Sequence, residues 1–191
     1  MNPRYFEEAI ETAQLLSTGK IILYPTDTIW GLGCSIHFKN SISRIYEIKG
    51  RDIQKSPILL VSSLEMLNRY IHRIHPRIDT LLSYHQRPLT VIFPKTKDLP
   101  DEVLASDGSV AIRICQDPFC KIMIEALNAP ILSTSANLSN EPSPRIFTEI
   151  SESIKQNVDY IVRHRQNEMT EGVASTIIRY DKDGEIIVLR E

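Results

Sequence analysis

The chain has 191 residues, of which 42% are apolar, and its 22 Lys plus Arg against 24 Asp plus Glu give a formal charge of −2. This length can bury one good core but is short for two full-sized domains, so we expect a single domain over residues 1–191. The near-neutral charge excludes a global attraction to nucleic acid or membrane, so any anion site has to be local.

The apolar pattern predicts helices and strands that alternate along the chain. We predict helices at 5–16, through 42–48, through 66–67, at 76–84, at 119–127 and through 146–154. We predict strands at 21–24, 31–36, 58–61, 90–93, 110–114, 131–132 and 160–162, and a closing hairpin of 176–179 and 186–189. Residues 133–144 are predicted to form a polar loop. Ser62 and Glu65 have the spacing of a capping box, which favours Ser62 as a helix cap. The pattern indicates an α/β domain with a mixed sheet.

The three cysteines, Cys34, Cys115 and Cys120, are an odd number without C-x-x-C spacing, and each borders an apolar run. They are typical of reduced, mostly buried thiols. A metal site on Cys115, Cys120 and a histidine stays open, but no zinc-finger spacing occurs and we predict no metal site. Since no run of about 18 apolar residues and no secretion signal is present, we expect a cytoplasmic protein without membrane contact.

Four polar segments border predicted strands, where α/β folds usually place their ligand sites. They are residues 26–28, 49–55, 133–137 and 172–175. The chain has no Walker, dinucleotide-binding or nucleophile-elbow motif, which argues against P-loop, Rossmann and α/β-hydrolase chemistry.

Lys49 and Arg51 flank a glycine at the end of a predicted helix. A point cation beside a planar five-donor guanidinium can grip several phosphate oxygens. Two basic residues at a helix C-terminus also stabilise the helix dipole, and taken alone the local sequence favours that second reading.

The other polar segments leave similar alternatives open. The three hydroxyls and one amide of 133–137 would be costly if buried without partners, so they indicate either a ligand or a self-bonded turn. Arg113 lies on an apolar strand, where its guanidinium reaches either an anion or water.

In their order along the chain, these segments resemble the YrdC/YciO family from about residue 18 to residue 190. Residues 24–33, Tyr-Pro-Thr-Asp-Thr-Ile-Trp-Gly-Leu-Gly, are similar to the family's opening P-T-[DE]-T-x-[YWF]-G-L signature. The further matches are K-x-R at 49–51, V-A-[VI]-R at 110–113, S-x-N at 135–137, P-S-P at 142–144, G-x-x-S-T-[IV] at 172–177 and L-R at 189–190.

The resemblance implies an open, twisted α/β sheet flanked by helices, with a concave basic cleft. It also implies a nucleotidyltransferase that forms L-threonylcarbamoyladenylate and pyrophosphate from L-threonine, bicarbonate and ATP, for the threonylcarbamoyladenosine modification of tRNA. N-carboxythreonine brings its own nucleophilic oxygen and ATP its own leaving group, so the protein has to position two anions and neutralise charge. Mg²⁺ is expected on the phosphates, held largely by ATP and water.

Site residues follow from the resemblance by matched position. Those implied for ATP are Lys49, Arg51, Lys55, Ser135, Asn137, Ser143 and Arg190. Those implied for threonine are Thr28, Arg113 and Ser175, and the implied catalytic set is Lys49, Arg51, Ser135 and Asn137. Because the chain resembles the family's short form, a separate carbamoyl-transferring protein is expected as a partner, and direct binding of tRNA stays open.

Two rival functions remain at this level. One is a YciO-like paralogue that shares the cleft but has different chemistry, and the other is an RNA-binding module without synthase activity. The intact K-x-R and S-x-N pairs favour the synthase. The chain departs from the family pattern at Leu60, Asn140 and Ala174, and also at Arg87, which replaces a glycine and is a candidate extra cation for the cleft.

Overall fold

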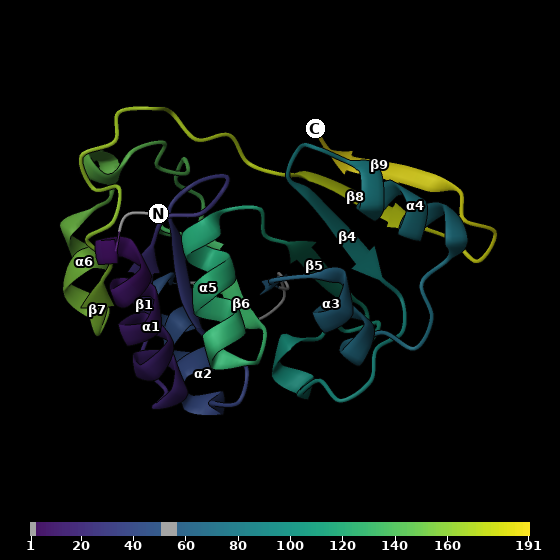
Figure 1. Cartoon of the computed structure of the whole chain (residues 1–191), viewed down its shortest axis with the longest axis horizontal. Coiled ribbons are helices and arrows are strands. Elements are labelled where there is room, and N and C mark those ends of the chain that lie inside the picture. The colour runs from purple at the N-terminus through teal and green to yellow at the C-terminus, as the bar shows by residue number, and fades with distance from the viewer. Residues whose placement is uncertain (1–2, 51–56) are drawn as a thin grey trace.

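The structure is a computed structural model that describes residues 3–50 and 57–191 (Figure 1). Within these ranges one mixed sheet of nine strands runs through the molecule in the order β7-β1-β2-β6-β3-β5-β4-β8-β9. The strands are β1 Ile22–Tyr24, β2 Gly31–Ser35, β3 Ile58–Val61, β4 Leu89–Phe93, β5 Val110–Ile114, β6 Ile131–Ser135, β7 Tyr160–Ile161, β8 Thr176–Tyr180 and β9 Ile186–Arg190.

Six α-helices flank this sheet in the described ranges, so the predicted α/β class with a mixed sheet and flanking helices is confirmed. They are α1 Pro3–Ser17, α2 Lys39–Ile48, α3 Leu64–Tyr70, α4 Pro76–Tyr84, α5 Pro118–Leu127 and α6 Glu152–Asn157, with 3₁₀ turns at Asp101–Val103 and Phe147–Glu149. Helices α1 and α5 pack side by side over the part of the sheet that contains β1 and β6 (Figure 1).

Apolar clusters form on both faces of the sheet because successive side chains of a strand point to opposite sides. Ile22 and Tyr24 belong to the larger cluster, whereas Leu23 between them belongs to a smaller one with Trp30 and Leu32. No helix in the described part of the chain combines the length and hydropathy of a membrane span.

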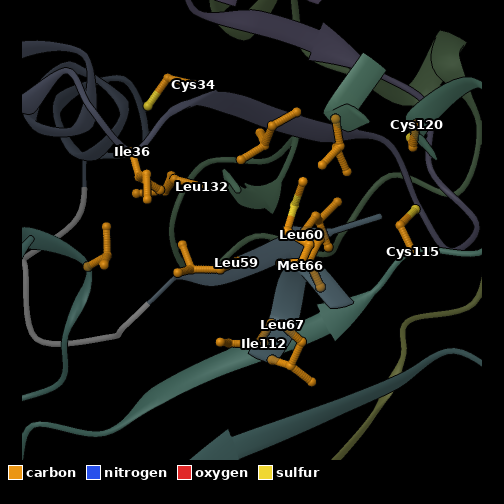
Figure 2. Packing of buried hydrophobic residues seen from close by; sticks show 14 of the residues in the cluster. Cys34, Ile36, Leu59, Leu60, Met66, Leu67, Ile112, Cys115, Cys120 and Leu132 are labelled. Carbon is orange, nitrogen blue, oxygen red and sulfur yellow. The ribbon is translucent and has the colours of Figure 1, made fainter. Parts of the chain in front are cut away.

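The three cysteines are buried and free, as predicted. In Figure 2, Cys34 lies at one end of the apolar cluster and Cys115 and Cys120 lie together at the other. Burial raises the pKa of the Cys34 thiol to about 12. The pKa of Cys120 is also raised, first by burial and then by a hydrogen bond with Cys115.

These thiols are expected to be inert in the native protein, because alkylation needs an accessible thiolate. Iodoacetamide at mildly alkaline pH should leave the folded chain unmodified, whereas the chain unfolded in guanidinium chloride should gain three adducts by mass spectrometry. Rapid labelling of any thiol before unfolding would contradict the buried placement.

The polar stretch after residue 132 differs from the prediction of a loop. Ser133, Thr134 and Ser135 continue strand β6 and pair with β2, where Gly31 is opposite Ser135 and Gly33 opposite Ser133. The backbone bonds to β2 outweigh the low strand propensity of serine, because β6 lies between two neighbouring strands.

Two helix boundaries also differ from the prediction. Ser63, rather than Ser62, caps α3, and its hydroxyl accepts a hydrogen bond from the Met66 amide at 3.2 Å. The single helix expected through 146–154 is instead a 3₁₀ turn followed by α6. The chain becomes extended at Ile150, and Ser151 caps α6, since a serine hydroxyl competes with helical backbone bonds.

Candidate functional site

Two rows of paired residues run across the sheet from β6 to the edge strand β9, and all of their members except Thr90 line one cavity. Directly paired residues on neighbouring strands point to the same face. The first row consists of Ser133, Ile58, Ala111, Ile92 and Arg179. The second row consists of Leu60, Arg113, Thr90, Ile177 and Arg190. Basic and hydroxyl side chains therefore meet on one face although they come from distant parts of the chain.

The cavity above these rows has a volume of about 560 Å³. Every predicted site residue that the structure describes lines it, namely Thr28, Lys49, Arg113, Ser135, Asn137, Ser143, Ser175 and Arg190. Arg51 and Lys55 lie outside the described residues. Arg87 is exposed and is not among the lining residues.

Arg113 is buried and lines the cavity, so the alternative of a water-facing strand residue was wrong. Its side chain is 6% exposed and forms an ion pair with Asp27, from Nη2 to Oδ1 at 3.2 Å. Nη1 donates to the Thr28 hydroxyl at 3.0 Å, and that hydroxyl lies 2.8 Å from the hydroxyl of Thr26. The turn between β1 and β2 thus holds the guanidinium from one side.

The remaining nitrogen of this guanidinium, Nε, has no protein partner among the described residues. Nε of Arg113 is buried without a hydrogen-bond acceptor. A buried donor without a partner is costly, and such groups are found where a ligand completes the site. Since Arg113 lines the cavity, Nε and a neighbouring Nη can form the two parallel bonds that a carboxylate accepts.

Lys49 connects the end of α2 to the segment after β6. Lys49 is 3% exposed, and its Nζ donates to the backbone oxygens of Ser135 and Asn137, each at 2.7 Å. Lys49 is the C-cap of α2, as its place at the helix end predicts, and its side chain binds the segment after β6. Its charge lies in the cavity wall and orients the 135–137 backbone.

The same wall holds two more buried polar atoms without partners among the described residues. They are Oδ1 of Asn137 and the hydroxyl of Ser139. The Asn137 amide nitrogen donates to the backbone oxygens of Leu138 and Glu141, so its oxygen is held in place and can accept a hydrogen bond. The segment is therefore part strand and part self-bonded turn, and its residues line the cavity. That it binds a ligand stays a prediction.

Ser175 and Arg190 are joined directly where β8 begins and β9 ends. Nε and Nη2 of Arg190 donate to the Ser175 backbone oxygen at 3.0 and 2.8 Å. The Ser175 hydroxyl lies 2.8 Å from the hydroxyl of Thr90, which is fully buried. Burial, and then the charge of Arg113, lower the pKa of Arg190. An anion between these two guanidiniums would relieve that repulsion.

Sequence reasoning missed several residues that shape the cavity. Asp27, inside the opening motif, balances the Arg113 charge. The Ser133 hydroxyl accepts a hydrogen bond from Tyr24 at 2.8 Å and lines the cavity, as do Ser139 and Arg179. The motif and the polar stretch could have pointed to Asp27, Ser133 and Ser139, but no local pattern marks Arg179.

The described lining contains cationic side chains and hydroxyls but no carboxylate. Among the described residues, no group of three or more His, Cys, Asp or Glu side chains could hold a metal ion. This chemistry suits an anionic ligand with several oxygens, and any divalent cation would have to be carried by that ligand.

The chain belongs to the Sua5/YciO/YrdC family. The profile of that family, described as "Telomere recombination", matches residues 14–191. A threonylcarbamoyl-AMP synthase of Xanthomonas euvesicatoria is 32% identical over 176 residues, which make up 90% of this chain and 92% of that protein.

Solved structures agree with this assignment. The chain resembles Pyrococcus abyssi Sua5 complexed with L-threonine, with a TM-score of 0.84 and 27% identity over 95% of this chain and 53% of the other. It therefore spans about half the length of that archaeal protein. It also resembles E. coli YciO, with a TM-score of 0.84 and 25% identity over 97% of this chain and 89% of the other.

Proposed function

We propose that this chain is an L-threonylcarbamoyladenylate synthase, a nucleotidyltransferase that supplies the activated group for a tRNA modification. The observation that carries the proposal is the convergence of eight predicted ligand residues on one cavity. The naming of full-length relatives as threonylcarbamoyl-AMP synthases supports it. We place this activity in the cytoplasm, as the sequence predicts.

In this proposal the part of the cavity around Arg113 binds L-threonine. The carboxylate would take up Nε and one Nη of Arg113, while the hydroxyls of Thr28 and Ser175 orient the rest of the amino acid. The amine reacts with bicarbonate, with loss of water, to give N-carboxythreonine. Its new carboxylate oxygen then attacks the α-phosphorus of ATP and displaces pyrophosphate.

The nucleotide would lie beside Lys49, Ser135, Asn137, Ser143 and Arg190, and Arg190 would place it next to the Ser175 and Arg113 of the amino-acid site. These residues would hold the triphosphate in line with the attacking oxygen and neutralise the charge that gathers on the leaving group. Arg51 and Lys55 belong to the same proposal by matched position. The lining offers no carboxylate ligand for Mg²⁺, so the proposed ion would be held by phosphate and water.

The decisive experiment measures pyrophosphate release from ATP in the presence of Mg²⁺ and bicarbonate, with and without L-threonine. We expect release that depends on threonine, and a product with the mass of threonylcarbamoyl-AMP. D-threonine and L-valine are matched controls, since each changes one recognised feature of the amino acid. Release without threonine, or no release at all, would contradict the synthase proposal.

The likeness to E. coli YciO makes a paralogue with other chemistry the second candidate. The same assay separates the two, because a paralogue or an RNA-binding module would not release pyrophosphate with threonine. A separate carbamoyl-transferring protein and tRNA complete the proposed pathway. RNA binding that weakens steeply with salt, without ATP turnover, would favour the RNA-binding alternative.

A further inference from the structure

A crossing segment, residues 162–175, runs from β7 to β8 along the edge of the molecule (Figure 1). It lies against the turn between β1 and β2 at two points. Gly172 approaches the backbone oxygen of Thr28 so closely that a Cβ would lie 1.9 Å from it, and Arg165 reaches the backbone of Thr26. The turn therefore separates the cavity from Arg165 and Gly172, whereas Ala174 and Ser175 at the end of this segment line the cavity.

Arg165 ties three parts of the fold together. Its Nη1 donates to the Thr26 backbone oxygen at 3.0 Å and to Oδ2 of Asp117 at 2.9 Å, and its Nε contacts Glu168. The other carboxylate oxygen of Asp117 caps α5 by accepting from the Cys120 amide at 2.9 Å. One guanidinium thus fixes the turn relative to the first turn of a helix.

The backbone and the charge of Arg165 both suit this role. Its φ of +67° lies in the left-handed region that non-glycine residues rarely adopt, and such conformations persist where the surrounding contacts hold them. Burial lowers its pKa, but the hydrogen bond to Glu168 and the charge of Asp117 outweigh this effect and raise it overall. The guanidinium therefore stays charged.

Hydrogen bonds connect Thr26 through Thr28 to Arg113, which lines the cavity. Among the described residues, Arg165 is the donor to the Thr26 backbone oxygen. The Thr26 hydroxyl accepts from the Thr28 amide at 3.0 Å, and the Thr28 hydroxyl accepts from Arg113. Arg165 lines a small depression on the other side of the turn and is not among the residues that line the cavity.

We propose that Arg165 is a positioning residue for the amino-acid site. It does not touch the substrate, and acts through Thr26 and Thr28 to hold Arg113 ready for an α-carboxylate. This role rests on the proposed function, because it concerns the affinity of that same site for threonine. Without the Arg165 guanidinium, the turn between β1 and β2 loses its hydrogen bond to the crossing segment. We therefore expect a lower affinity for threonine.

The kinetic test compares Arg165→Gly, Arg165→Lys and the control Arg163→Met. Glycine suits the left-handed backbone and removes the guanidinium, so it separates the contact from backbone strain. Arg163 lies in the same segment, but its 72% exposed side chain pairs with Glu8 and Glu11 rather than with the turn. We expect Arg165→Gly to raise the threonine KM about tenfold, which corresponds to the loss of one charge-assisted hydrogen bond. The ATP KM should stay within about twofold of the wild-type value.

A lysine ammonium can donate to one of the acceptors of Arg165, but it lacks the planar geometry with which the guanidinium bridges them. The threonine KM of Arg165→Lys should therefore lie between that of wild type and that of Arg165→Gly. Arg163→Met should leave both KM values unchanged. Equal increases of the two KM values in Arg165→Gly, or a similar effect of Arg163→Met, would overturn the proposal.

A second measurement does not depend on catalysis. Hydrogen exchange of the Thr28 amide, followed in the ligand-free protein, should be faster in Arg165→Gly than in wild type and unchanged in Arg163→Met. Unaltered exchange in Arg165→Gly would refute the positioning role even if the synthase is confirmed. Absence of threonine-dependent pyrophosphate release in the wild-type protein would refute the proposed function. The exchange measurement would still test whether Arg165 holds the turn, because it does not depend on catalysis.

Discussion

Arg113→Ala is expected to raise the threonine KM roughly 30-fold or more, while the ATP KM changes far less. Losing one partner of a buried charge pair with a ligand costs about 2–5 kcal/mol. The bound carboxylate would lose both the Nε donor and a neighbouring Nη, whereas Lys49 and Arg190 would still face the nucleotide. Steady-state pyrophosphate release, measured with threonine and ATP varied separately, gives the two KM values. Equal effects on both would contradict the assignment of Arg113 to the amino acid.

The same substitution leaves Asp27 buried without its cation. Its side chain is 9% exposed, and breaking a buried pair from one side typically costs about 3–5 kcal/mol of folding free energy. The double variant Arg113→Met, Asp27→Asn removes both charges, and the side-chain amide oxygen that it introduces can still accept from the Gln116 backbone amide, as the Asp27 carboxylate does. We expect it to recover most of the thermal stability but none of the threonine affinity, which separates binding from folding.

Gly172→Ala is expected to lower kcat/KM for threonine about 100-fold, the effect of misplacing a substrate-positioning group by about 1 Å. The added Cβ would lie 1.9 Å from the Thr28 backbone oxygen and 3.2 Å from the Ile29 Cα. Backbone atoms cannot turn aside as a flexible side chain does, so the 28–29 peptide or the crossing segment has to move. The Thr28 hydroxyl, which holds Arg113, would move with it.

A matched control is Gly108→Ala, because a Cβ there meets no atom within 4 Å. Gly108 has a φ of +76°, so alanine should cost about 1 kcal/mol or slightly more of stability without any clash. We expect its kinetic constants to stay within about twofold of wild type. Comparable losses of activity in both variants would mean that the effect of Gly172→Ala comes from general destabilisation rather than from displacement of Thr28.

Most elements and most of the candidate site could be predicted from the sequence. Apolar periodicity located the helices α1 and α5, because each of them buries one face. The turn signal at 183–184 located the closing hairpin of β8 and β9, although every residue of β9 is exposed. The order of the polar motifs indicated the cavity residues. The prediction was wrong at Ser133–Ser135, where pairing with neighbouring strands outweighs the local preference for a loop. It was also wrong at helix boundaries where a nearby serine caps the helix. That residues 1–191 act as one domain stays a prediction.

The sequence by itself determined which residue types are available for the chemistry, a set of hydroxyls and cations attached to strands and turns. Only the tertiary structure decided which of them meet. Strand register places Arg113 beside Thr90 and Leu60, and it turns the guanidinium inward toward Asp27. The support of the turn by Arg165 depends on a contact between residues 139 positions apart, and no local pattern encodes it. The physical reason is that side-chain direction and long-range pairing depend on how the whole sheet closes, whereas composition and periodicity report on neighbouring residues.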